Sequence, residues 1–151
     1  MQRIANSCGL IFLSCLLLAC VPAHHDEASE FLAGTAWELL SIQSMDDATG
    51  TTQISQPARY TLTFGANGRA SFRLNCNRVT GDWHAQPDSG ESGQLVFGQL
   101  VATKALCSPP SEDERVVRDM VYVRSYLLRE GQLHMSLYAD GGIYTWRRSV
   151  Q

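Results

Sequence analysis

Two cysteines in the body of the chain, Cys76 and Cys107, are the residues with the widest chemical range. They could form a disulfide, contribute to a metal site, or supply a nucleophile. A metal site would need more ligands nearby, because there is no Cys-x-x-Cys motif and the nearest histidine, His84, stands alone. A nucleophilic cysteine would need a basic partner. The cellular compartment helps to decide between these three uses, because disulfides persist in oxidising surroundings.

The first 20 residues indicate that compartment. Residues 17–20 read Leu-Leu-Ala-Cys, close an apolar run that starts at Leu10, and resemble a bacterial lipobox, in which a signal peptidase cuts before a lipid-modified cysteine. The run is far shorter than the ~20 apolar residues of a transmembrane helix. We therefore expect a lipoprotein signal peptide over residues 1–19 and lipidation of Cys20. The alternative is an ordinary secretory signal that is cut after Ala23.

Lipidation would anchor the exported chain to a membrane through acyl chains on Cys20. Val21 rather than aspartate follows this cysteine. The resemblance to Gram-negative lipoproteins then implies the outer membrane, and we expect the protein to face the periplasm. In that oxidising compartment Cys76 and Cys107 are expected to pair. Chain entropy predicts that such a disulfide stabilises the fold by roughly 3 to 4 kcal/mol.

The exported chain is mildly acidic. The full chain has 12 Lys plus Arg and 15 Asp plus Glu, and the loss of Arg3 with the signal peptide would change the net charge from −3 to −4. Because phosphate neutralisation demands a dense basic surface, we expect no nucleic-acid partner and no attraction to anionic lipid headgroups. Residues 20–33 are polar after the cysteine and predict a flexible tether. Its His-His-Asp-Glu cluster at 24–27 fits a charged tether better than a metal site, and we expect neither metal nor cofactor.

Residues 34–148 suffice for one domain with a single core. Alternating apolar residues predict strands at 35–42, 60–64, 70–74, 79–84, 94–97, 126–128, 133–138 and 143–146. The second and third form a clear hairpin, because Asn67-Gly68 supplies turn residues between them. A loop rich in glycine and serine is expected over 87–93.

One helix is predicted among these strands. After Pro109-Pro110, Ser111 to Glu114 has the spacing of a capping box with acidic residues in the first turn, and an apolar face at helical spacing follows as far as residue 124. The sequence thus predicts an α+β domain of about eight antiparallel strands. We expect a strongly curved sheet or cracked β-barrel, with the helix at about 111–124 packed against it.

Several motifs identify a family resemblance over most of the chain. They are Trp37 with Leu39, Leu-Thr-Phe at 62–64 before Asn67-Gly68, Cys-Asn-Arg-Val-Thr-Gly at 76–81, Leu-Val-Ala-Thr-Lys-Ala-Leu-Cys at 100–107, and Leu-x-Met-x-Leu at 133–137. With these motifs the body resembles a META domain, the module of heat-shock lipoproteins of the HslJ type. The resemblance implies an α+β fold like a cracked barrel, similar to lipid-binding pilotin lipoproteins, and a loose link to stress, antibiotic tolerance and virulence. It implies no agreed molecular activity.

The resemblance places Asn77, Arg78, Gly81 and Thr103 in the family's motifs beside the two cysteines. An architectural interpretation is that Asn77 and Thr103 bond backbone groups near the bridge, while Gly81 permits a bulge or a close strand approach. A binding surface is the alternative. Arg78 is the best functional candidate, because a charged fork beside a rigid bridge could hold a carboxylate or a phosphate.

Catalysis is not expected. His84 and His134 lie in strand-like segments, His134 as an outward-facing polar residue, and no serine, histidine and acid grouping stands out. Our main hypothesis is a non-enzymatic, stress-related envelope lipoprotein that binds other envelope proteins. The second is a carrier or sensor of a lipid or other apolar small molecule, with the barrel lined by Trp37, Phe64, Phe72, Trp83 and Trp146. A weaker third is an inhibitor of an envelope hydrolase, which would need a rigid exposed loop such as 87–93.

Overall fold

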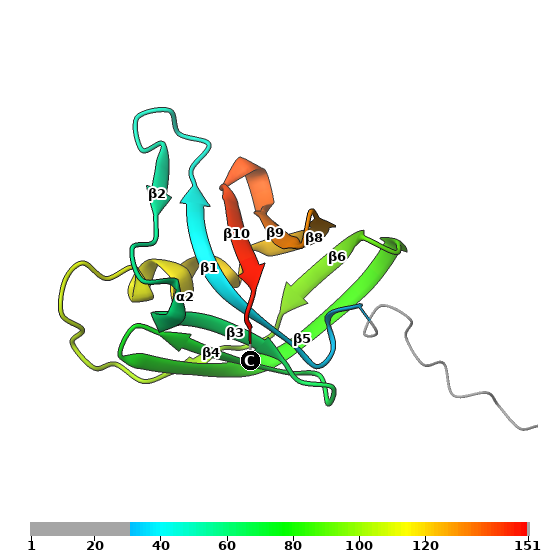
Figure 1. Cartoon of the computed structure of the whole chain (residues 1–151), viewed down its shortest axis with the longest axis horizontal. Coiled ribbons are helices and arrows are strands. Elements are labelled where there is room, and N and C mark those ends of the chain that lie inside the picture. Colours follow the sequence, from blue (N-terminus) through cyan, green and yellow to red (C-terminus); the bar gives the residue numbers. More distant parts are fainter. Residues whose placement is uncertain (1–30, 151) are drawn as a thin grey trace, which may run out of the picture.

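The computed structural model describes residues 31–150 of the chain. Its strands are β1 (Thr35–Gln43), β2 (Thr51–Gln53), β3 (Tyr60–Phe64), β4 (Arg69–Leu74), β5 (Asn77–Ser89), β6 (Ser92–Phe97), β7 (Val101–Ala102), β8 (Val123–Arg129), β9 (Gln132–Leu137) and β10 (Ile143–Arg148). Within the described residues they form one antiparallel sheet in the order β10-β9-β8-β6-β5-β4-β3-β1-β2, with β7 on β5 (Figure 1). Because β10 also pairs with β1, eight of these strands close into a barrel.

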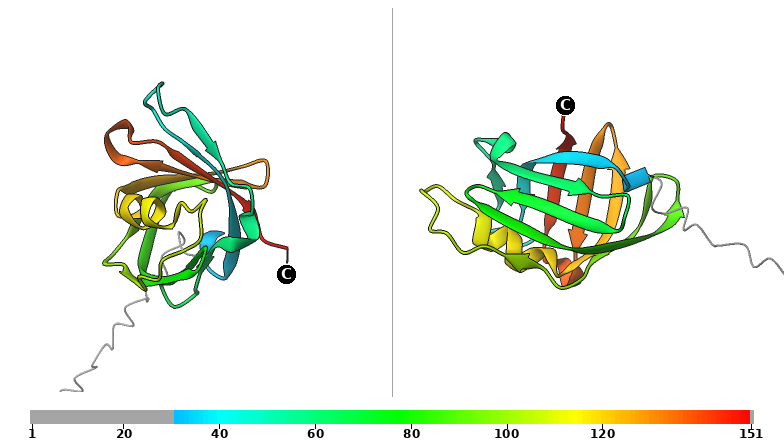
Figure 2. Two further views of the ribbon diagram at one scale, coloured as in Figure 1. Left: turned by 90° about the vertical axis from the view of Figure 1, so that its left-hand side faces the viewer. Right: turned by 90° about the horizontal axis from the view of Figure 1, so that it is seen from below.

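The helix α2 (Asp113–Met120) lies across one end of this barrel (Figure 2). Its side chains reach three separate strands: Asp113 contacts β5, Arg115 donates to Thr52 of β2, and Asp119 accepts a 2.7 Å hydrogen bond from Tyr144 of β10. Burial and this bond to a carboxylate raise the pKa of Tyr144 well above its usual value. Within residues 31–150, no helix is long and apolar enough to cross a membrane.

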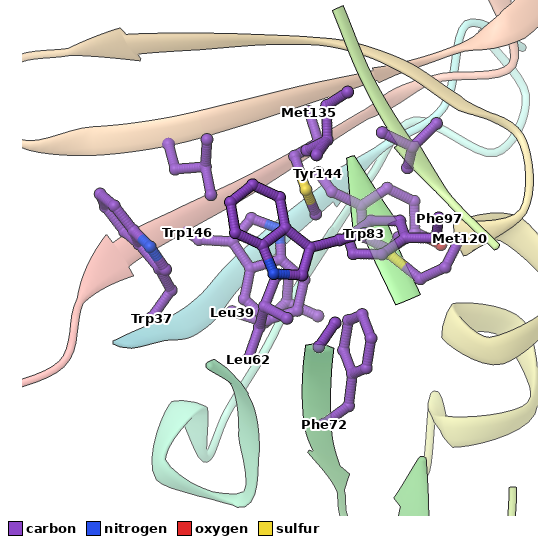
Figure 3. Close-up of a cluster of buried hydrophobic side chains, with 14 of the residues drawn as sticks. Trp37, Leu39, Leu62, Phe72, Trp83, Phe97, Met120, Met135, Tyr144 and Trp146 are labelled. Carbon is purple, nitrogen blue, oxygen red and sulfur yellow. The ribbon is translucent and has the colours of Figure 1, made fainter. Parts of the chain in front are cut away.

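Alternation along the strands separates the interior from the surface. In β4 every second residue is buried, and the same pattern continues through most of β5. Inside, aromatic rings pack on one another: the centroid of Phe64 lies 5.0 Å from that of Trp83 and 6.1 Å from that of Phe97. The rings of Phe72 and Phe97, whose centroids lie 5.3 Å apart, are seen in Figure 3. The five aromatic residues predicted to line the barrel are each no more than 6% exposed and belong to this core. They are thus part of the packed interior of the barrel.

The predicted fold class is confirmed, and three boundaries need correction. The first is the start of the domain, because the sequence predicts a tether as far as residue 33. Leu32 is completely buried in the core, and its carbonyl accepts a 2.6 Å hydrogen bond from Thr35 Oγ1. These residues therefore belong to the folded body. The predicted signal peptide, Cys20 and the tether before residue 31 lie outside the described residues.

The second correction concerns the loop predicted over 87–93, which is wrong. β5 continues to Ser89 and β6 begins at Ser92, so only Gly90-Glu91 remains as a turn. Gly93 pairs directly with Pro87 across the hairpin. A Cβ atom at Gly93 would overlap the carbonyl oxygen of Gln86, so glycine is needed here for close strand approach and not for a loop.

The third correction concerns the helix, which is shorter at both ends than 111–124. The predicted capping box does not form: the helix begins at Asp113, and Glu112 at the N-cap makes no side-chain capping bond. Ser111 Oγ instead donates to Asp113 Oδ1 at 2.5 Å. The hydroxyl that a capping box would use is thus taken by Asp113, and it also accepts a hydrogen bond from the distant Asn75. At the other end the chain passes into β8 from Val123.

Candidate functional site

The candidate site lies where the β4–β5 turn meets the segment that leads from β7 to α2. The structure joins Cys76 and Cys107 in a disulfide with an S–S distance of 2.01 Å and a Cα–Cα distance of 5.5 Å. Cys76 is exposed at the turn, and Cys107 is partly buried. The bridge therefore fastens the end of the 101–107 segment to the start of β5.

Asn77 holds the middle of that segment. Its side chain is buried, with 4% of the residue exposed. Its Oδ1 accepts hydrogen bonds from Thr103 Oγ1 and from the Ala105 N–H, each at 2.8 Å. Its Nδ2 donates to the Ala105 carbonyl at 2.9 Å and to Asp113 Oδ2 at 2.7 Å. Because both ends of the amide are engaged, Asn77 is an internal clamp between β5, the segment and the helix.

Thr103 is joined to the backbone of Arg78 by two hydrogen bonds. The Thr103 N–H donates to the Arg78 carbonyl, and the Arg78 N–H donates to Thr103 Oγ1, both at 3.0 Å. The Thr103 hydroxyl thus links the segment to β5 through Asn77 Oδ1 and the Arg78 N–H. The side chain of Arg78 is free to meet solvent, because it alternates outward between the buried Asn77 and Val79.

A buried polar network continues below the bridge. Asp113, 8% exposed, stands in the first turn of α2, where the helix dipole favours negative charge. Its partner Ser111 also accepts a 2.8 Å hydrogen bond from Asn75 Nδ2 and lies 3.3 Å from the hydroxyl of Tyr60. That hydroxyl accepts from the Glu112 N–H at 3.0 Å. The network holds the helix start rigidly against the barrel.

A groove of about 440 Å³ lies between the 101–107 segment and α2. One wall carries Ala102 and Ala105, the other Val117, and the buried Asn77 and Asp113 also line it. Leu106 stands at its edge and is 100% exposed. A second depression of about 230 Å³ adjoins it on the side of the bridge. Leu106 is therefore an apolar projection on a segment that the amide clamp and the bridge immobilise.

The arrangement is suited to binding. In residues 31–150 no three His, Cys, Asp or Glu side chains converge as metal ligands. His84 is exposed on β5. His134 lies between two buried residues of β9, and its Nδ1 is 3.2 Å from Thr145 Oγ1. The outward orientation predicted for His134 is thus confirmed. Neither histidine joins the pair of Ser111 and Asp113, so the network has no imidazole to act as a general base.

Comparison with known proteins places the fold. Residues 30–149 match the family model of the META domain. The chain belongs to this family. The META domain resembles an NMR structure of a protein from Burkholderia xenovorans, with 20% identity, a TM-score of 0.64 and 100% of both chains covered. It also resembles a crystal structure of a DUF4847 family protein from Bacteroides vulgatus, with 13% identity, a TM-score of 0.53, and 82% of this chain and 98% of that one covered. No curated protein matches the sequence.

The two motifs that carried the resemblance meet in space in this META domain. Val79 pairs with Ala102, which sets the 76–81 motif beside the 100–107 motif. Gly81 permits this approach, because a Cβ there would lie 2.8 Å from the carbonyl oxygen of Gln99. Of the three predicted site residues, Asn77 and Thr103 touch through their side chains, whereas the side chain of Arg78 points away from the groove.

Sequence reasoning missed two residues near this site. The sequence predicts Asp113 only as a first-turn acid of the helix, yet it is the buried partner of Asn77. Alternation predicts Arg73 only as a polar strand position, yet it pairs in register with Arg78. The hairpin spacing from residue 73 to residue 78 around the 75–76 turn was the signal that could have predicted this second contact.

Proposed function

We propose that this META domain protein is a non-enzymatic envelope lipoprotein that acts by binding another envelope protein. In this proposal a lipid on Cys20 anchors it to the outer membrane, and its domain faces the periplasm. The lipobox-like sequence and the short apolar run support the anchor. The resemblance to heat-shock lipoproteins supports a role in stress.

The observation that carries the proposal is the complete exposure of Leu106 on an immobilised segment. Its neighbour Ala105 is bonded twice to Asn77, and the next residue, Cys107, is fixed by the bridge. Contact with a partner would remove the apolar surface of this leucine from water. A projection already held in one conformation loses little conformational entropy on binding. Such a projection next to a groove suits an apolar side chain of a protein partner.

The partner's side chain would enter the groove between Leu106 and Val117. A photoreactive residue placed at position 106 in the exported, anchored chain should then form one adduct of defined mass with an envelope protein. The same residue at position 127 is the matched control, because Leu127 is 40% exposed on β8, outside the groove lining. The substitution Ala105→Asp should abolish the adduct at position 106 while the purified protein keeps its melting temperature, because Ala105 lines the groove and is exposed.

Equal labelling from positions 106 and 127 would refute the groove as a docking site. A native mass spectrum of the purified protein gives an independent check. A clean mass of the polypeptide with its anchor agrees with the protein-binding proposal. A further bound molecule that leaves only on denaturation would favour the carrier hypothesis instead.

A further inference from the structure

On the outside of the barrel, strands β4 and β5 carry two cross-strand pairs of charged residues. One pair joins opposite charges, and the other joins like charges. Arg69 lies opposite Asp82, and their side chains form a 2.8 Å ion pair. Arg73 lies opposite Arg78 in the same ladder. Both residues of the second pair are exposed. Like charges in direct cross-strand register destabilise a sheet. The Arg73–Arg78 pair therefore lowers the stability of the sheet, whereas the Arg69–Asp82 pair raises it.

The surroundings of the Arg73–Arg78 pair leave its charge uncompensated. Along the same row of the sheet, Thr61 lies beside Arg73. The next position is Glu38, whose carboxylate is held by Arg147 at 2.7 Å. Among residues 31–150, neither Arg73 nor Arg78 forms an ion pair. The two arginines, which are opposite each other in register and exposed, therefore have guanidinium forks available for an external anion.

We propose that Arg73 and Arg78 form a docking site for an acidic segment of the protein partner, with its carboxylates on the two forks. The inference rests on the proposed function, because it specifies the charge of the surface that would cover the groove. Arg78 is bonded through its backbone to Thr103, three residues before Leu106, so the arginine pair and the apolar projection stand on directly bonded segments. In this proposal the partner extends from the groove over the neighbouring strands β4 and β5.

A polypeptide fits this site better than a polyanion such as nucleic acid or a lipid surface. The chain as a whole carries a formal net charge of −3, so its long-range field repels dense negative charge. Two arginines among uncharged Thr61, Ser71 and Thr80 can satisfy only a few carboxylates at short range. The apolar projection beside them also matches the mixed character of protein interfaces.

The test is a titration of a fluorescent glutamate-rich peptide with the full chain in a neutral detergent at low salt, followed by anisotropy. The double variant R73Q/R78Q should bind the peptide about fivefold or more weakly, as expected for two charge-assisted contacts. R129Q is the control for loss of an exposed arginine outside the proposed site. It should change the peptide affinity by less than about twofold, because an exposed charge contributes little at a distance. The melting temperature of R73Q/R78Q should stay the same or rise, because a like-charge contact is removed.

Equal peptide affinity for the wild type and R73Q/R78Q would overturn the inference. Binding of phosphatidylglycerol vesicles that depends on the arginine pair, with no binding of the glutamate peptide, would also overturn it and assign the site to phosphate headgroups. Neither result depends on the adduct at position 106. If the chain with the photoreactive residue at position 106 and both arginines intact forms no adduct, the proposed function alone is refuted. If the same chain carrying R73Q/R78Q forms the adduct in undiminished yield, only the acidic character of the partner is refuted.

Discussion

Replacing Asn77 by aspartate should turn the strongest contact of the clamp into a repulsion. In the native protein Asn77 Nδ2 donates to Asp113 Oδ2 at 2.7 Å, and both residues are buried. The substitution N77D keeps the size and the acceptor oxygen but replaces the donor by a second carboxylate oxygen. It therefore isolates the charge of this contact from its shape.

The size of the effect can be worked from that distance. Two unit charges 2.7 Å apart repel by about 6 kcal/mol at an effective dielectric constant of about 20. Protonating one ordinary aspartate at pH 7 costs about 4 kcal/mol, because its reference pKa is about 3.9. Protonation costs less than the repulsion, so one carboxyl of the pair binds a proton. The cost of protonation is then the largest destabilisation that the second carboxyl can cause. The lost hydrogen bond to the Ala105 carbonyl adds about 1 to 2 kcal/mol.

The assay is urea unfolding of N77D, N77A and the wild type between pH 4 and pH 7. In folded N77D the two carboxyls share a proton, whereas in the unfolded chain both ionise above about pH 4. The folded state then binds more protons, so its stability relative to wild type should fall by about 1.4 kcal/mol for each pH unit as the pH rises. N77A lacks the second carboxylate and should show a constant loss across this range.

The exchanged pair N77D/D113N provides the decisive control. It restores one donor and one acceptor at the contact with their direction reversed, and it should recover about 2 kcal/mol or more relative to N77D at pH 7. An N77D variant with the same pH dependence as N77A would refute the direct contact. An exchanged pair that is no more stable than N77D would refute it as well.

Three further predictions follow from contacts elsewhere in the fold. C76S and C107S should each lower the stability by about 4 kcal/mol, and the double variant by no more, when measured by thermal unfolding; additive losses would mean that the two residues are not paired. The phenol of Tyr144 donates to Asp119, so in the folded protein its phenolate absorbance should be absent at pH 10, and Y144F should lose about 1 to 2 kcal/mol; ordinary titration near pH 10 would contradict the buried bond. G81A should lose about 1 to 3 kcal/mol in urea unfolding, because its Cβ would press on the neighbouring backbone; an unchanged urea midpoint would show that the strands have room to separate.

The sequence predicts the regular parts of the barrel because their signals are local. The hairpin of β3 and β4 was predictable from strict alternation and from turn residues between its strands. The last three strands were predictable for the same reason. Closure of the barrel was not, since the pairing of Trp37 with Arg148 joins residues at opposite ends of the chain.

The predictions were wrong where one local sequence pattern is compatible with two different structures. Gly93 belongs to a glycine- and serine-rich stretch that indicated a loop, but close packing on Gln86 and Pro87 requires a glycine inside the hairpin. Ser111 has capping-box spacing, but its hydroxyl is used by Asn75 and Asp113. In both cases a tertiary contact overrode a valid local signal.

The candidate site was predictable only in part. The motifs identified Asn77, Thr103 and Arg78, and the register of β5 with β7 brings the first two together. Asp113 and Arg73 reach the site through a helix start and a strand register, which a pattern along the chain does not contain. Positions that depend on three-dimensional neighbours thus need the structure.

The pairing of β1 with β10 also has a consequence for the order in which the protein is made. β1 is the first strand of the barrel to be synthesised, and one of its edges has no partner until β10, the last, is complete. During that interval the chain presents an open strand edge, which is a site for misassembly with other chains. The barrel can therefore close only after β10 has been synthesised. A truncation that removes β10 would leave open edges on both β1 and β9.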